Sequence, residues 1–149
     1  MEKVSIGDFV KIRKLSSLTL SPSGEKAAFC VTSGDVEENR YRTDIWVWDE
    51  GHAPSLYRLT AGEDGKAPVF LDEDTVLFPG DRKNRYPAEN GVSKTVLNRI
   101  ALSGGEAEEL FVLPFPASDL TPVGEGLYLA SGLRDLSLPD LSGMSGEEK

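Results

Sequence analysis

A two-part pattern that occurs twice in this chain constrains its fold more than any other feature. In the first copy, the turn Ser21-Pro22-Ser23-Gly24 precedes an apolar run at 26–32, and a second apolar run follows at 44–49. In the second copy, an acidic turn and an apolar run occupy 71–78, and a further run covers 95–102. Each copy therefore predicts a set of short strands in the same order.

The spacing of the copies identifies the repeat. Phe78 follows Phe29 by 49 positions (78 minus 29), and four-stranded propeller blades recur every 40–50 residues or so. A third copy begins at 123–130. A blade buries its faces only against neighbouring blades. We therefore expect an all-β chain that forms a partial β-propeller of about two and a half four-stranded antiparallel blades.

The repeat predicts the division of the chain. The expected parts are an N-terminal helical segment (1–14), a first blade (15–66), a second blade (67–117), the start of a third blade (118–135) and a flexible tail (136–149).

A short helix is expected over residues 5–14. Ser5 and Asp8 have the spacing of a capping box, with the aspartate in place of the usual glutamate. Ile6, Phe9 and Val10 then give a rough apolar face.

The run at 26–32 is apolar on both faces. Ala27, Phe29 and Val31 alternate with Ala28 and Cys30. A strand that lies between two neighbouring sheets needs this pattern. The run at 44–49, with its Trp and aliphatic residues in alternation, fits the same position in a blade.

The strand order predicts one face of the propeller as an interaction surface. The polar loops at 33–43 and 80–94 both join a second strand to a third, so they emerge on the same side as the inter-blade connections. The candidate rim or inter-domain contacts in these loops are Glu37, Glu38, Arg40, Arg82 and Arg85. A pair of carboxylates at Glu37 and Glu38 could hold a cationic group, or could balance the neighbouring arginines in solvent.

Charge and composition exclude several classes of partner. The formal net charge is −9, which argues against a nucleic acid, because phosphate binding needs a basic surface. No stretch approaches the 20 or so apolar residues that span a bilayer, so no membrane partner is expected. The single cysteine and the absence of a secretion signal indicate a cytoplasmic protein.

The chain offers little for catalysis. Its only histidine, His52, lies in a turn, and the nearest imitation of a nucleophile elbow, around Ser145, has Glu147 where the final glycine should be. One cysteine and one histidine cannot form a structural zinc site, and the acids at 72–74 lack the spacing of a calcium loop. No catalytic residue, metal site or cofactor is expected.

Four segments resemble the start of prolyl oligopeptidase-family peptidases, most closely the acylaminoacyl-peptidase and dipeptidyl-aminopeptidase-like branch. They are 8–13, 18–24, 27–29 and 37–46. The family's usual turn is Ser-Pro-Asp-Gly, and Ser23 replaces the aspartate here. The resemblance covers roughly residues 5–131.

The resemblance implies a non-catalytic part of a serine peptidase that acts on peptides. In that family, a propeller of about seven or eight blades caps an α/β-hydrolase domain and restricts entry to its serine. The implied partners are the remaining blades, the hydrolase domain and, through the whole enzyme, a peptide substrate. The alternative is a non-enzymatic TolB-like or WD-repeat-like propeller that serves as a binding scaffold. A third hypothesis is a short protein that self-associates through its exposed sheet edges.

Overall fold

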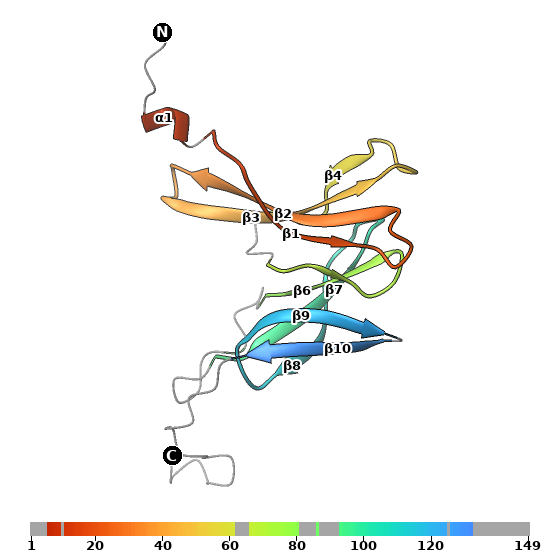
Figure 1. Cartoon of the computed structure of the whole chain (residues 1–149). Coiled ribbons are helices and arrows are strands. Elements are labelled where there is room, and N and C mark those ends of the chain that lie inside the picture. The colour runs from red at the N-terminus through yellow and green to blue at the C-terminus, as the bar shows by residue number, and fades with distance from the viewer. Residues whose placement is uncertain are drawn as a thin grey trace, which may run out of the picture.

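The computed structural model describes residues 6–9, 11–61, 66–80, 86, 93–124 and 126–132. The regular elements of the described residues are strands, apart from one short helical turn (Figure 1). The elements are α1 (Ile6–Phe9), β1 (Lys14–Leu20), β2 (Lys26–Asp35), β3 (Arg40–Asp49), β4 (Leu56–Arg58), β5 (Val69–Phe70), β6 (Thr75–Pro79), β7 (Thr95–Ala101), β8 (Glu108–Leu113), β9 (Ala117–Gly124) and β10 (Leu127–Gly132).

These strands form three antiparallel sheets, each built from consecutive segments of the chain. The first sheet has the order β1-β2-β3-β4, the second has the order β5-β6-β7-β8, and β9 pairs with β10 in a two-stranded sheet. The sheets lie one above another, with the second sheet between the other two (Figure 1). This arrangement of antiparallel four-stranded sheets matches a partial propeller-like fold.

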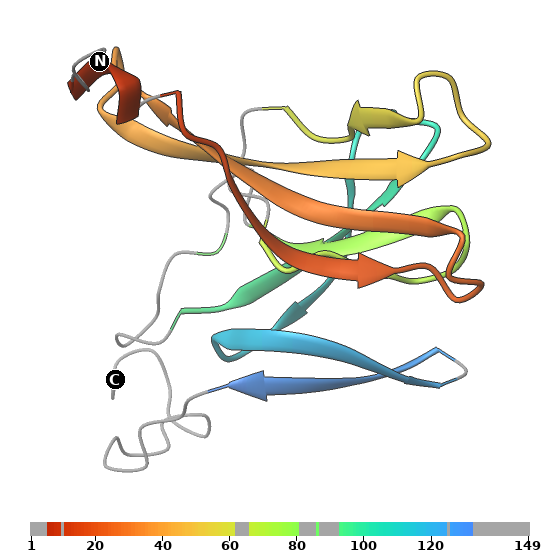
Figure 2. The same ribbon diagram turned by 45° about the horizontal axis from the view of Figure 1, so that its top comes forward.

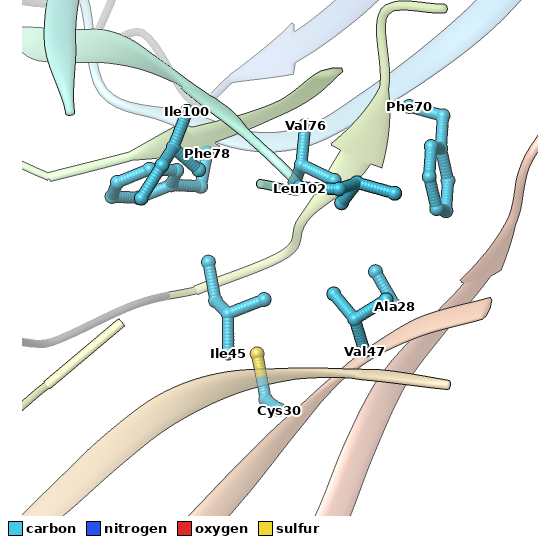
Figure 3. Packing of buried hydrophobic residues seen from close by; sticks show 9 residues of the cluster. All are labelled: Ala28, Cys30, Ile45, Val47, Phe70, Val76, Phe78, Ile100 and Leu102. Atoms are coloured by element: carbon cyan, nitrogen blue, oxygen red, sulfur yellow. The ribbon is translucent and has the colours of Figure 1, made fainter. Parts of the chain in front are cut away.

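The hydrophobic core lies between the first and second sheets. Figure 3 shows two sets of apolar side chains that point toward each other across this interface. From the first sheet come Ala28, Cys30, Ile45 and Val47, and from the second come Phe70, Val76, Phe78, Ile100 and Leu102. The two sheets therefore bury their facing surfaces against each other, as propeller blades do.

Strand register shows which apolar residues of β2 and β3 share each face of the first sheet. Ala28 pairs with Val47 and Cys30 with Ile45, so these four residues share the face that meets the second sheet. The intervening residues of β2 and β3 point to the opposite face. The prediction of two apolar faces is confirmed for this sheet.

The turn between β1 and β2 follows from its sequence. The amide of Gly24 donates to the carbonyl of Ser21 at 2.9 Å, and Gly24 has a φ of +79°. Glycine adopts this backbone conformation without the steric penalty of a side chain. The motif Ser21-Pro22-Ser23-Gly24 thus closes the hairpin and aligns Lys26 at the start of β2.

The predicted N-terminal helix over residues 5–14 is wrong. Among the described residues of this segment, one helical turn, Ile6–Phe9, is present, and strand β1 already begins at Lys14. Lys14 pairs with Thr32 of β2, and these sheet hydrogen bonds replace helical ones. The side chain of Asp8 binds Lys11 at 2.8 Å, and its expected capping partner Ser5 lies outside the described residues.

The predicted polar loop at 33–43 is also wrong in extent. β2 continues to Asp35 and β3 begins at Arg40, so a turn at 36–39 is all that separates them. Cross-strand pairs such as Ser33 with Arg42 continue the ladder into this segment. Most of the loop at 80–94 and the whole predicted tail at 136–149 lie outside the described residues, and the domain boundaries stay a prediction.

Candidate functional site

The predicted rim residues Glu37, Glu38 and Arg40 lie at the end of a protruding hairpin. β1 reaches only as far as Thr32 along β2, and β4 pairs only with residues 46–48 of β3. In the described part of the chain, residues 33–42 therefore pair only with each other. We call this segment the hairpin arm; it extends beyond the rest of the first sheet (Figure 2).

Ion pairs hold the end of the hairpin arm together. The Glu38 carboxylate binds Arg40 Nη2 at 2.6 Å and Arg42 Nη2 at 3.1 Å. Arg42 Nη2 also binds Asp35 at 2.8 Å, and the Glu38 amide donates to Asp35 Oδ1 at 3.1 Å. Opposite charges from both strands and the turn therefore fix the shape of the tip.

This network separates the roles of the two adjacent glutamates. Glu38 is bound to Arg40 and Arg42 of its own hairpin, so it does not form a pair of free carboxylates with Glu37. Glu37 is exposed at the turn, and the described residues provide it with no ion-pair partner. Of the two, Glu37 is the side chain that a partner can reach without breaking the arm.

The structure brings together only part of the predicted set. Glu37, Glu38 and Arg40 occupy one tip, while Arg82 and Arg85 lie outside the described residues. The turns β1–β2 and β3–β4 lie at the opposite end of the first sheet (Figure 2). The tip therefore lies at the end of the first sheet away from these two turns.

A polar junction that the sequence analysis missed joins the first and second sheets. Lys26 Nζ, at the start of β2, binds Asp74 Oδ1 at 2.7 Å and the carbonyl of Glu73 at 3.2 Å. Asp49 Oδ2 lies 3.7 Å from the same amine. The hydrogen bond to Asp74, together with the three nearby acids, raises the pKa of Lys26 despite the opposing effect of desolvation.

The turn motif contributes the second half of this junction. The Ser23 amide and hydroxyl both donate to the Glu73 carboxylate, the hydroxyl at 2.9 Å. Desolvation would raise the pKa of Glu73, but these hydrogen bonds and the charge of Lys26 outweigh it and lower the pKa. The signal in the sequence was a basic residue directly after one turn and acids in the equivalent turn of the next repeat.

His52 and Cys30, two residue types that often serve in catalysis, make local contacts or lie in the core here. His52 Nδ1 lies 3.0 Å from the carbonyl oxygen of Pro54, and its ring centroid is 4.5 Å from that of Tyr57. Cys30 is buried in the core, and this desolvation raises the pKa of its thiol. Ser145 lies outside the described residues.

The described residues offer neither a metal-binding cluster nor a membrane-spanning helix. No group of three or more His, Cys, Asp or Glu side chains in them could hold a metal ion. None of the helices in the same part of the chain is long and apolar enough to cross a membrane.

Comparison with known proteins gives a likeness in fold. No family model matches the chain, and no curated protein matches it. Among solved structures, the chain is similar to an acylaminoacyl peptidase in complex with Z-Gly-Gly-Phe-chloromethyl ketone, with a TM-score of 0.55 and 17% sequence identity. The match covers 76% of this chain and only 16% of that one. At this identity the likeness shows the fold alone.

Proposed function

We propose that this chain is the amino-terminal part of the β-propeller of a serine peptidase of the prolyl oligopeptidase family. The observation that supports this most is the structural match to an acylaminoacyl peptidase, which extends over 76% of the chain. The sheet order supports it too, because two four-stranded antiparallel sheets packed face to face are what neighbouring blades require.

In this proposal, the chemistry belongs to an α/β-hydrolase domain that is distinct from residues 1–149. The described residues hold one histidine in a turn and a buried cysteine, so nothing here resembles a nucleophile with its base. The propeller would restrict entry so that peptides reach the serine of that domain, and it would dock against the domain through one of its faces.

We assign the docking role to the tip of the hairpin arm. Three features support this: the arm extends beyond its own sheet, its shape is fixed by ion pairs, and Glu37 is exposed at its end. Charged residues on a rigid support suit the polar rim of an inter-domain contact.

The experiment is activity-based labelling of the native protein. An antibody raised against residues 1–132 is used to capture the protein from cells that express it, and the captured material is treated with a fluorophosphonate probe. We expect the probe to label a polypeptide much larger than 16.2 kDa, and we expect turnover of an aminoacyl-nitroanilide. The recombinant 149-residue chain is the matched control and should show neither.

A captured protein of any size that contains the repeat but does not react with the probe would contradict the peptidase proposal. That result would favour the non-enzymatic propeller scaffold instead. If labelling succeeds, Glu37→Ala in the whole enzyme tests the docking role, with Val36→Ala as control. Only the first should change the rate ratio between long and short peptides.

A further inference from the structure

The polar junction between the first two sheets and the hairpin arm lie at opposite ends of one strand. Lys26 is the first residue of β2, and Asp35, in the arm, is its last. Figure 2 shows the end of the arm on the side of the first sheet away from the β1–β2 turn. At about 3.4 Å per residue, the strand carries the tip roughly 30 Å from the junction.

Each half of the junction is held by hydrogen bonds within its own sheet. On the first sheet, the Lys26 amide donates to Ser21 Oγ at 3.2 Å, and the Lys26 carbonyl accepts from the Ser21 amide at 2.9 Å. On the second sheet, the Asp74 amide donates to Asp72 Oδ1 at 2.8 Å, and the Asp74 carbonyl accepts from the Leu102 amide at 2.8 Å. A shift at the junction is therefore passed on to the strands behind each turn.

The contacts between the two halves are directional. Lys26 Nζ donates to Asp74 Oδ1 at 2.7 Å and to the carbonyl of Glu73 at 3.2 Å, while the Ser23 hydroxyl donates to Glu73 Oε2 at 2.9 Å. Hydrogen bonds of this kind depend on both distance and angle. The Lys26 side chain is only 20% exposed, so its interactions are less screened than those at an open surface. A rotation of one sheet against the other weakens several of these contacts at once.

The apolar core between the same sheets does not supply an equal constraint. Its members from the first sheet are short side chains, namely Ala28, Cys30, Ile45 and Val47 (Figure 3). Burial of apolar area is non-directional, so a small rotation changes the buried area little. Over the length of β2, however, a rotation of about 10° displaces the arm tip by about 5 Å.

We propose that the polar junction sets the orientation of the first sheet on the second, and thereby the position of the hairpin arm. Ser23 and Lys26 are then positioning residues for the tip, although they lie at the far end of the strand. This inference concerns contacts within the described residues, and only its consequence for docking rests on the proposed function. A displaced tip would no longer meet the domain against which it docks.

The test is a distance measurement by pulsed electron paramagnetic resonance between two spin labels on the 149-residue chain. Val36→Cys places one label at the tip of the arm, where the native side chain is 68% exposed. Glu108→Cys places the other in β8 of the second sheet, where the native side chain is 66% exposed. The native Cys30 is buried, and a chain without the two introduced cysteines checks that it takes up no label.

The labelled parent should give one narrow distribution of distances. Lys26→Met should broaden this distribution and move its mean by several ångströms. Adding Asp74→Ala to Lys26→Met should have no larger effect than Lys26→Met alone, because both remove the same contact. Ser23→Ala should broaden the distribution less, since the Ser23 amide still binds Glu73.

Ile45→Val is the matched control, because it loosens the apolar core without touching the junction. It should lower the urea midpoint and leave the distance distribution as in the parent. All variants should keep the circular dichroism spectrum of the parent, and Ser23→Ala, at an exposed turn residue, carries the test if Lys26→Met does not.

An unchanged distribution in both Lys26→Met and Ser23→Ala would overturn the proposal. Equal broadening in Ile45→Val would also overturn it, because the orientation would then come from the core. In the whole enzyme, Lys26→Met should change the rate ratio between long and short peptides as Glu37→Ala does. A broadened distribution with an unchanged ratio would support the positioning inference and refute the docking role of the tip.

Discussion

Truncation of Ile45 tests whether the first and second sheets pack as two blades. Ile45 is fully buried, and it points from β3 toward Phe78 and Ile100 of the second sheet (Figure 3). Ile45→Ala removes three carbon groups, and at about 0.8 kcal/mol each their transfer alone is worth about 2.4 kcal/mol. A residual cavity between rigid sheets adds to this, so we expect a total loss of about 3–4 kcal/mol.

Ile45→Val gives a graded comparison, because it removes a single carbon group from the same site. It should lower the free energy of unfolding by about 1 kcal/mol. Leu56→Ala, in β4 and 48% exposed, is the control and should lose less than half as much as Ile45→Ala.

The assay is urea unfolding followed by tryptophan fluorescence and far-ultraviolet circular dichroism, at a protein concentration that keeps the chain monomeric. The m-value should stay constant, so that shifts in midpoint report stability. A loss below about 1 kcal/mol for Ile45→Ala, or one equal to that of Leu56→Ala, would show that this face is not packed against a second sheet.

Two further predictions concern the polar junction. Lys26→Met should lower the free energy of unfolding by under about 1 kcal/mol at neutral pH, since the ion pairs are partly exposed. Because folding raises the pKa of Lys26, the stabilisation by this residue is complete below the ordinary lysine pKa of about 10.4 and disappears as the pH rises through the folded value. Urea midpoints from pH 7 to 11 will show this loss. Glu73→Gln should act on the acid side: the folded pKa of Glu73 is lowered, so its contribution is complete above the ordinary glutamate pKa of about 4.3 and disappears as the pH falls through the folded value. Midpoints of the parent chain and the Gln variant that converge at low pH would agree with this, and a constant difference down to pH 2 would contradict it.

The strands of this fold could be predicted because each depends on local sequence. Alternation of apolar residues and the turn at Ser21–Gly24 located β2, and the register of Ala28 with Val47 confirms the faces that alternation assigned. The helix over 5–14 was predicted incorrectly because the pairing of Lys14 with β2 outweighs the weak capping signal of Ser5 and Asp8. Tertiary pairing of this kind overrides local propensity.

The contacts of the hairpin arm and of the polar junction could not be predicted from the sequence in the same way. Glu37, Glu38 and Arg40 are neighbours in the sequence, but the different states of the two glutamates follow from the extension of β2 and β3, which fixes Arg42 opposite Ser33. The junction of Lys26 with Asp74 spans 48 positions in the chain. A contact between distant turns follows only once the stacking of the sheets is known.

The consecutive strand order also bears on how this chain acquires its structure. Every strand pair in the described part of the chain forms between sequence neighbours, so each sheet can close soon after the ribosome has released its last strand. The first sheet would then wait with Ala28, Cys30 and Ile45 in water until the second sheet follows. Chaperone binding during synthesis should therefore peak in that interval, and ribosome-bound chains that end between the two sheets should be the most prone to aggregate.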